Sequence, residues 1–283
     1  MKVLVTGVKG QLGYDVLKEL SKRQYEAVGV DREEMDLMDD KAIRQVIHTI
    51  TPEAMIHCAA YTAVDCAERE SATCYQVNSE AVKVIAMCAK ELDIPLIYIS
   101  TDYVFDGTKQ EAYVETDQPN PLNVYGASKL KGEQYVQSLL TKYYIVRISW
   151  VFGRNGNNFI KTMRRLGIER EELNIIHDQV GSPTYTAHLA PLLVDMLETN
   201  QYGIYHATNE GDCSWYEFAN EIFRQSGIEI KTNPITTEQY PSQAKRPLNS
   251  TMSKSKLSQN GFQILPNWKQ AITAYLNSIE NQD

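Results

Sequence analysis

The stretch KVLVTGVKGQLGYDVLKEL, residues 2–20, decides the fold because a strand pattern, a glycine turn and a helix pattern follow one another in it. Residues 2–6 form a short apolar run rich in β-branched side chains, which Gly7 ends. Residues 10–20 carry apolar side chains at helical spacing. These side chains are Leu12, Val16, Leu17 and Leu20. A strand that leads through a turn into a helix predicts the first unit of an α/β fold.

Three glycines lie in this predicted turn: Gly7, Gly10 and Gly13, in a G-x-x-G-x-x-G array. Glycines let the turn and the helix start bring backbone N–H groups close to a pyrophosphate, whose negative charge the helix dipole favours. A tight turn that binds nothing would use the same residues. The strand-turn-helix context nevertheless favours a dinucleotide-binding loop.

Short apolar runs alternate with helical segments through the first half of the chain. The apolar runs are residues 25–30, 54–58, 95–100 and 143–149, and helical segments include residues 40–50 and 79–92. This alternation predicts an α/β protein with a Rossmann-like, doubly wound parallel sheet.

The second half of the chain has a looser pattern, with turn-rich segments such as GRNGNN at residues 153–158. Ser214 and Glu217 form a capping box that opens an apolar helix. We expect a dinucleotide-binding domain at residues 1–152. A smaller mixed lobe at residues 153–283 is expected mainly to bind substrate, with some of its segments rejoining the first domain.

The composition limits the classes of partner. A net charge of −8 argues against a nucleic-acid surface, which needs clustered Lys and Arg. The N-terminal apolar run is short, and no stretch reaches the ~18 apolar residues of a membrane span, so we expect a cytoplasmic protein without a membrane partner. The five cysteines and five histidines contain no C-x-x-C or H-E-x-x-H pair, so we predict no metal site built by the protein.

The end of the second predicted strand leaves the choice of cofactor open. Asp31 there can accept both ribose hydroxyls of the adenosine and so favours NAD. Arg32 follows it, and a guanidinium at this place, helped by Lys9, can instead bind the 2′-phosphate of NADP. Asp36 and Leu37 fit either a loop beside the adenine or the N-cap region of the next helix.

Tyr125 and Lys129 in YGASK share one helix face, since four residues separate them. A reductase needs a proton donor beside the carbonyl that receives hydride, and a neighbouring ammonium can tune a tyrosine for that task. Thr101 ends a predicted strand, where α/β sheets bind ligands, and its hydroxyl can orient the carbonyl. The sequence thus contains a candidate proton donor (Tyr125), a lysine that can adjust its pKa (Lys129) and a hydroxyl that can orient the carbonyl (Thr101).

Tyr14 and Lys18 in YDVLK have the same spacing, so spacing alone proves nothing. This second pair belongs to the first predicted helix and has no hydroxyl partner like Thr101 nearby in the order of elements. We expect it to lie on a solvated helix face.

The chain resembles the extended short-chain dehydrogenases/reductases and, within them, the family of dTDP-4-dehydrorhamnose reductases. The resemblance runs nearly end to end. It is carried by GQLG (10–13), AAYTAVDCAE (59–68), STDYVFDG (100–107), PLNVYGASKLKGE (121–133), RISWVFG (147–153), DQVGSPTYT (178–186), CSWYEFA (213–219) and RPLNS (246–250).

The resemblance implies that Tyr125 donates a proton, Lys129 holds the nicotinamide ribose and tunes Tyr125, and Thr101 contacts the sugar carbonyl. The cofactor contacts that it implies are Gly7, Gly10, Gln11, Leu12, Gly13, Asp31, Arg32, Asp36, Leu37, Ala59, Ala60, Tyr61, Ile99, Tyr125 and Lys129. The substrate contacts that it implies are Thr62, Val64, Thr101, Asp102, Tyr103, Trp150 and Arg246. For Arg246, a pairing with the substrate diphosphate and a surface ion pair stay open.

The implied reaction is hydride transfer from NAD(P)H to the C4 ketone of dTDP-4-dehydro-6-deoxy-L-mannose (dTDP-4-dehydrorhamnose), which gives dTDP-L-rhamnose for cell-surface polysaccharides. NADP(H) is the expected cofactor, and NAD(H) is also used in the family. A monomer or homodimer is expected. Some family members form Mg²⁺-linked dimers through acidic residues, but Asp15 stands here where a longer acid is expected, so Mg²⁺ is not predicted.

Two other kinds of function compete with this interpretation. A sugar-nucleotide epimerase or dehydratase shares the tyrosine and lysine, but a 4,6-dehydratase resembling its own family would carry Thr-Asp-Glu where this chain has Thr101-Asp102-Tyr103. A non-catalytic dinucleotide-binding regulatory subunit would use the same fold. The presence of Thr101, Tyr125 and Lys129 together weighs against it.

Overall fold

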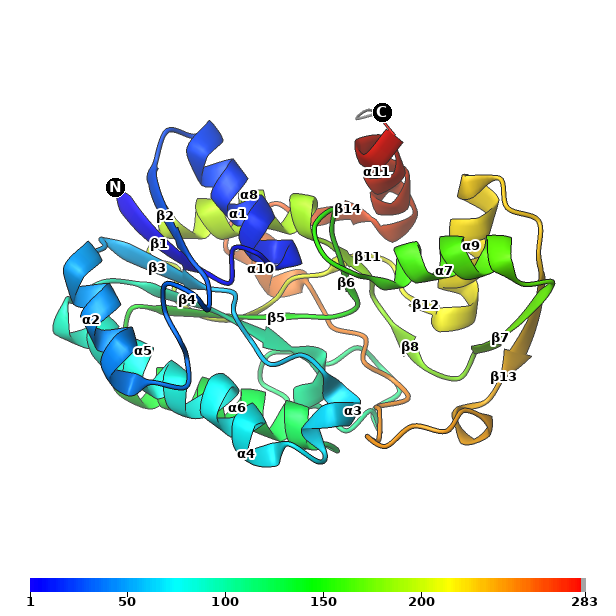
Figure 1. The fold of residues 1–283 in the computed structure, drawn as a ribbon, viewed down its shortest axis with the longest axis horizontal. Helices are drawn as coiled ribbons and strands as arrows, with labels where there is room; N and C mark the ends of the chain where they lie inside the picture. The colour runs from blue at the N-terminus through cyan, green and yellow to red at the C-terminus, as the bar shows by residue number, and fades with distance from the viewer. Residues whose placement is uncertain (281–283) are drawn as a thin grey trace.

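A six-stranded parallel sheet lies at the centre of the computed structural model, which describes residues 1–280 (Figure 1). Its strand order is β10-β5-β4-β3-β1-β2, and every neighbouring pair is parallel. The strands are β1 (Lys2–Thr6), β2 (Glu26–Val30), β3 (Ala54–His57), β4 (Leu96–Thr101), β5 (Tyr143–Ile148) and β10 (Gly203–His206). The predicted Rossmann-like fold class is confirmed.

The winding of the sheet reverses at β1. This strand pairs with β2 on one side and with β3 on the other. In open α/β sheets, the crevice outside the carboxyl ends of the strands at such a switch point is where ligands bind. The glycine turn after β1 opens into this crevice.

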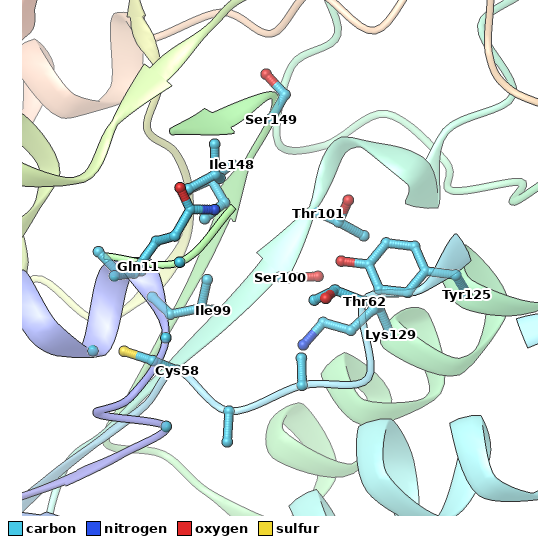
Figure 2. Close-up of a pocket in the computed structure, with 18 of the residues that line it drawn as sticks. Gln11, Cys58, Thr62, Ile99, Ser100, Thr101, Tyr125, Lys129, Ile148 and Ser149 are labelled. Atoms are coloured by element: carbon cyan, nitrogen blue, oxygen red, sulfur yellow. The ribbon is translucent and has the colours of Figure 1, made fainter. Parts of the chain in front are cut away.

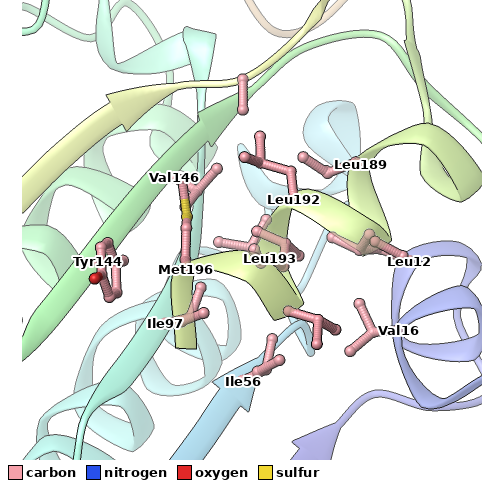
Figure 3. Close-up of a cluster of buried hydrophobic side chains, with 14 of the residues drawn as sticks. Leu12, Val16, Ile56, Ile97, Tyr144, Val146, Leu189, Leu192, Leu193 and Met196 are labelled. Atoms are coloured by element: carbon pink, nitrogen blue, oxygen red, sulfur yellow. The ribbon is translucent and has the colours of Figure 1, made fainter. Parts of the chain in front are cut away.

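Helices cover both faces of the sheet, which explains why its strands are almost continuously apolar. One face packs against α1 (Gln11–Lys22) and α8 (Thr186–Leu197), with Leu12, Val16, Leu189 and Leu193 in the core between them (Figure 3). The other face carries α2 (Asp40–Ile50), α5 (Ala81–Glu91) and α6 (Val124–Leu139).

The chain between β3 and α5 is helical but irregular. It contains α3 (Val64–Ala67), α4 (Ser71–Tyr75) and a π-helical segment, Gln76–Glu80, that runs into α5. The sequence pattern did not predict this π-helical segment. A 3₁₀ turn, Asp102–Val104, similarly follows β4.

A smaller lobe lies beside the sheet and is built mainly from α7 (Phe159–Glu169), α9 (Trp215–Ser226) and α11 (Trp268–Glu280). Phe152, Phe218 and Tyr275 lie in its buried core. Ser214 and Glu217 form the predicted capping box at the start of α9. Four pairs of short strands complete the lobe and its links to the sheet: β6 (Val151–Phe152) pairs with β9 (Thr184–Tyr185), β7 (Glu172–Ile176) with β13 (Lys231–Ile235), β8 (Val180–Gly181) with β12 (Cys213–Ser214), and β11 (Asn209–Glu210) with β14 (Leu265–Asn267). The helix α10 (Ser255–Gln259) and a 3₁₀ turn, Thr237–Gln239, lie in the same half of the chain.

Two segments of the second half, α8 and β10, belong to the layers of the central sheet. The boundary between residues 152 and 153 stays a prediction. Within residues 1–280, no helix combines the length and the apolar character that a membrane crossing requires.

Candidate active site

The turn between β1 and α1 is shaped for close approach to a phosphate. Gly7 has a φ of +71°, and a Cβ on Gly13 would lie 2.3 Å from the Gly7 carbonyl oxygen. Gly10 is the N-cap of α1 and contributes no side-chain cap, so the first N–H groups of this helix face outward. A pyrophosphate fits this cradle.

A cavity of about 670 Å³ extends from this turn along the carboxyl ends of the strands (Figure 2). It brings together most of the residues that the sequence nominated. These are Gly7, Gly10, Gln11, Leu12, Gly13, Asp31, Ala59, Ala60, Thr62, Val64, Ile99, Thr101, Asp102, Tyr103, Tyr125, Lys129 and Trp150. The glycine turn and Asp31 lie in the same cavity as Tyr125 and Lys129, which is the arrangement that a dinucleotide requires.

A second cavity adjoins the first and shares Gly7, Asp31, Ala59 and Ala60 with it. The remaining nominated residues of the adenosine side line this second cavity: Arg32, Asp36, Leu37 and Tyr61. The N-cap of α2 is Asp39, which accepts hydrogen bonds from the backbone N–H groups of Lys41 and Ala42. Asp36 lies three residues before this N-cap, and its Oδ1 accepts a hydrogen bond from the backbone N–H of Met38 at 3.0 Å. Asp36 thus belongs to the turn that leads into α2 and also lines the second cavity, and its contact with an adenine stays a prediction.

Asp31 is held by the backbone around it. Its Oδ2 accepts a hydrogen bond from the backbone N–H of Lys9 at 2.9 Å, and its Oδ1 accepts one from that of Arg32 at 2.8 Å. The Lys9 ammonium pairs with Glu33 at 3.0 Å. The adenosine end of the two cavities thus contains both an acidic side chain, Asp31, and a basic one, Arg32, and this pair of residues fits NAD as well as NADP.

Local structure places Thr101 and Tyr125 beside each other. Thr101 is the last residue of β4, and Tyr125 lies in the first turn of α6, whose N-cap Asn123 accepts a hydrogen bond from the N–H of Gly126 at 2.8 Å. A Cβ on Gly126 would lie 2.1 Å from the Tyr103 carbonyl oxygen, so only glycine allows α6 to begin this close to β4. Figure 2 shows Thr101, Tyr125 and Lys129 around one part of the cavity.

Burial dominates the electrostatics of the pair. Burial raises the pKa of Tyr125, although the hydrogen bond between the side chains of Tyr125 and Thr101 opposes this rise. Burial also lowers the pKa of Lys129 to about 7, against the carboxylate of Glu133. Tyr125 is thereby kept protonated and able to donate, while Lys129 titrates near neutral pH. The expected lowering of the pKa of Tyr125 by Lys129 stays a prediction.

Asp102 extends the polar group around Thr101. The Thr101 hydroxyl donates to Asp102 Oδ1 at 3.0 Å. Burial raises the pKa of Asp102 to about 7, and the side chains of Ser250 and Thr101 oppose this rise. Tyr103 packs its ring edge-on against Tyr125 at 5.9 Å between ring centroids.

The far side of the cavity is aromatic. Trp150, which has a φ of +48°, stacks on Trp215 with 3.6 Å between ring centroids. Trp215 also lines a third cavity, which contains Arg246. The Arg246 guanidinium donates to both oxygens of Asp65, at 3.2 and 2.6 Å, and this pairing lowers the pKa of Asp65. Arg246 also hydrogen-bonds the side chain of Tyr103, which lines the main cavity. The ion pair with Asp65 is present in this structure, and a contact of Arg246 with the substrate diphosphate stays a prediction.

Several residues of the main cavity were missed by sequence reasoning. Ser100 and Ser149 lie at the carboxyl ends of β4 and β5, so their place at strand ends was a usable signal. Cys58 follows β3 in the same way. Trp215 has no such position at a strand end; it lies inside the CSWYEFA motif, at the first residue of α9, and its place in that motif was the available signal.

Gln11 plays a different part from the one its place in the glycine loop suggests. Its side-chain Oε1 accepts hydrogen bonds from the backbone N–H of Gly153 at 2.7 Å and from Asn158 at 3.3 Å. The side chain therefore ties the cofactor loop to the lobe. A contact of Gln11 with a pyrophosphate would have to come from its backbone.

Two acidic groups bear on the question of metals. Asp15 is buried, and its Oδ2 accepts a hydrogen bond from Thr186 at 2.5 Å, so it points into the protein and not toward a partner. His48, Cys88 and Glu91 offer ligand atoms within 4.8 Å of one another. Arg44 donates to both oxygens of Glu91, at 3.0 and 3.3 Å, and its charge disfavours a cation there.

Comparisons with known proteins agree with this geometry. The family model described as the RmlD substrate binding domain matches residues 1–281. The dTDP-4-dehydrorhamnose reductase of Aggregatibacter actinomycetemcomitans is 41% identical, with 96% of this chain and 97% of that protein covered. The spore coat polysaccharide biosynthesis protein SpsK of Bacillus subtilis is 36% identical, with 97% and 96% covered.

A solved structure extends the comparison to three dimensions. The dTDP-4-dehydrorhamnose reductase of Bacillus anthracis, in complex with NADP, superposes with a TM-score of 0.95. It is 42% identical, and the match covers 98% of this chain and 99% of that one.

Proposed function

This chain belongs to the dTDP-4-dehydrorhamnose reductase family, and on that premise we propose that it reduces the C4 ketone of dTDP-4-dehydrorhamnose to give dTDP-L-rhamnose. One observation carries the proposal. Thr101, Tyr125 and Lys129 line the same cavity as the glycine turn, so a proton donor and a dinucleotide loop face one space.

The chain's own residues would hold the cofactor at both ends. Backbone N–H groups at the start of α1 would hold the pyrophosphate, Asp31 and Arg32 would hold the adenosine, and Lys129 would hold the nicotinamide ribose, since these residues line the two adjoining cavities. When bound, NADPH or NADH supplies the hydride that the ketone carbon receives. The NADP complex of the Bacillus anthracis relative supports NADP(H) as the cofactor, with NAD(H) as an alternative.

Tyr125 would provide the proton. Its hydroxyl hydrogen passes from Oη to the ketone oxygen as that oxygen gains negative charge, and a C4 hydroxyl results. The Thr101 hydroxyl, which donates to Asp102 Oδ1 in this structure, would turn its hydrogen to the same ketone oxygen and so orient it. Protonated Lys129 stabilises the phenolate that Tyr125 becomes, until a proton from solvent restores it.

The surroundings of Thr101 favour simple reduction over dehydration. The residue two positions on is Tyr103, whose partly buried ring packs against Tyr125. A tyrosine there cannot assist water loss as a glutamate would. The product would serve as a rhamnose donor for cell-surface polysaccharides, which the name of the Bacillus subtilis relative supports.

The test is to mix purified protein with dTDP-4-dehydrorhamnose and NADPH, to follow NADPH absorbance, and to identify the product by NMR. We expect NADPH oxidation with formation of dTDP-L-rhamnose, and a parallel run with NADH measures the cofactor preference. Cofactor binding without oxidation would favour the regulatory-subunit alternative. Oxidation with only another sugar nucleotide would move the protein to a related reductase.

A further inference from the structure

The ammonium of Lys129 packs against the ring of Tyr98, a residue that is not among the site residues described above. Its Nζ lies 4.1 Å from the centroid of the Tyr98 ring. Lys129 is 2% exposed and Tyr98 is fully buried, so water contributes little to the solvation of this charge. A desolvated ammonium over a ring face is the geometry in which a cation–π interaction is strongest.

The nearby carboxylate of Glu133 is engaged elsewhere. Its Oε1 accepts hydrogen bonds from Ser100 at 2.6 Å and from Arg147 Nε at 2.9 Å, and its Oε2 accepts one from Arg147 Nη2 at 2.7 Å. Arg147 therefore balances the charge of Glu133. Among the described residues, no hydrogen bond or ion pair joins Glu133 to the Lys129 ammonium, so Glu133 supports this charge only from a distance, whereas the Tyr98 ring lies directly against it.

Tyr98 itself is fixed on all sides. Its hydroxyl donates toward the carbonyl oxygens of Asn78 at 3.2 Å and Lys129 at 3.3 Å, and its ring stacks on that of His57. A Cβ on Gly132 would lie 2.4 Å from the Tyr98 hydroxyl oxygen. Glycine is unfavourable inside a helix, and this close approach explains its presence in α6.

We propose that Tyr98 is a positioning residue for Lys129, whose ring holds the protonated ammonium at the place where it serves Tyr125 and the cofactor ribose. The purpose of this placement depends on the proposed function, whereas the contact between Lys129 and Tyr98 does not.

The groups around Lys129 determine its pKa, and therefore how this pKa should change when the Tyr98 ring is removed. Burial lowers the pKa of Lys129, and Glu133, Cys58 and Cys74 raise it. Burial lowers the pKa of His57, and the charge on Lys129 adds to this lowering. The charged and titratable groups that act on Lys129 or touch it are His57 in β3, Cys58 after β3, Cys74 in α4, Tyr98 in β4 and Glu133 in α6. Arg147 in β5 pairs with Glu133, and Tyr125 in α6 lines the same cavity as Lys129. Because a ring face favours the cation, its removal should lower the pKa of Lys129 further.

Three variants separate this role from simple packing. Tyr98→Leu removes the ring, and Tyr98→Phe keeps the ring but removes the hydroxyl. Tyr144→Leu is the matched control: Tyr144 is also fully buried, and it lies on the adjacent strand β5 in the core on the opposite face of the sheet. A loss caused only by truncating a buried tyrosine would appear equally in the Tyr144 variant.

The direct readout is the pKa of Lys129, measured by NMR titration of ¹³C-labelled lysine side chains and assigned with Lys129→Met. We expect this pKa to fall by about one pH unit in Tyr98→Leu and to stay within a few tenths in Tyr98→Phe and Tyr144→Leu. NADPH affinity measured by fluorescence at pH 7 should fall about fivefold in Tyr98→Leu alone, because a fall of the Lys129 pKa from about 7 to about 6 lowers the protonated fraction from about one half to about one tenth. An unchanged Lys129 pKa in Tyr98→Leu would overturn the proposal.

If Tyr98→Leu fails to fold, Gly132→Ala replaces it, because the new Cβ would lie 2.4 Å from the Tyr98 hydroxyl oxygen and 2.5 Å from the Asn78 carbonyl oxygen, so that the Tyr98 ring and the backbone at Asn78 must both shift. The same fall in the Lys129 pKa is expected, and an unchanged pKa counts against the proposal. The titration needs no substrate. A wild-type protein without reductase activity would refute the proposed function and leave this test intact.

Discussion

Two helices of this protein carry a tyrosine and a lysine four residues apart, and their surroundings differ. On α6, Lys129 is 2% exposed, and Tyr125 lies beside Thr101 in the main cavity. On α1, Tyr14 is 39% exposed, and Lys18 also lies at the surface. The spacing is the same, so the difference in chemistry has to come from burial and from the strand end that α6 approaches.

The largest expected difference between the pairs is in the proton donor. Tyr125→Phe should lower kcat about 10³-fold, because it removes the general acid and leaves the ring in place. Tyr14→Phe should leave kcat unchanged. Steady-state NADPH oxidation measures both, and circular dichroism checks that both variants fold. A Tyr125→Phe variant that keeps a tenth of the wild-type kcat would place the donor elsewhere.

Replacement of each lysine by methionine should change activity and stability in opposite directions at Lys129 and neither of them at Lys18. Lys129→Met should lower kcat/KM about 10²-fold, since one side chain serves both cofactor binding and Tyr125. It should also raise the free energy of unfolding by about 1 to 3 kcal/mol, because a buried ammonium carries a desolvation cost that methionine lacks.

The matched change, Lys18→Met, should leave kcat/KM as it is and alter the free energy of unfolding by less than about 0.5 kcal/mol. Kinetics and urea denaturation measure these quantities. If Lys129→Met lost stability as well as activity, Lys129 would be a structural residue and the contrast between the helices would weaken.

Removal of the Thr101 hydroxyl should have an intermediate effect. Thr101→Val should lower kcat by about 10- to 100-fold, because one hydrogen bond to the developing oxyanion is lost. Thr184→Val is the control, since Thr184 is equally buried in β9 and lies outside the main cavity. Equal losses in the two variants would point to packing and not to carbonyl orientation.

The smallest expected effect is in the pH dependence. The pKa of Lys129 is lowered to about 7, and the protonated form is the active one, so kcat/KM should fall as the pH rises through about 7. The pKa of Asp102 lies at about 7 as well. Asp102→Asn should keep this descending limb if Lys129 causes it, and its disappearance would assign it to Asp102.

The sequence predicted the parts of the fold that depend on local pattern. β1 and β3 are short apolar runs buried on both sides, and α2 coincides with its predicted residues 40–50 because its amphipathic period and its Asp39 cap are local signals. The sixth strand, β10, was not predicted. It has only four residues, Gly203–His206, and their pairing with β5 depends on tertiary contact.

The candidate site was predictable where chemistry coincides with a strand end or a turn. Thr101 and the glycine array are of this kind. The environment of Lys129 was not, because it comes from Tyr98 on a strand whose apolar run suggests only core, and from Gly132, whose close approach exists only in the folded protein. The π-helical segment that carries Asn78 likewise has no local sequence signal.

The central claim is that the pair on α6 performs the chemistry and the pair on α1 does not. Its most direct test is single-turnover NADPH oxidation by wild-type, Tyr125→Phe and Tyr14→Phe proteins with dTDP-4-dehydrorhamnose. We predict a rate about 10³-fold lower for Tyr125→Phe and a wild-type rate for Tyr14→Phe. A wild-type rate for Tyr125→Phe, or an equal loss in both variants, would contradict the claim.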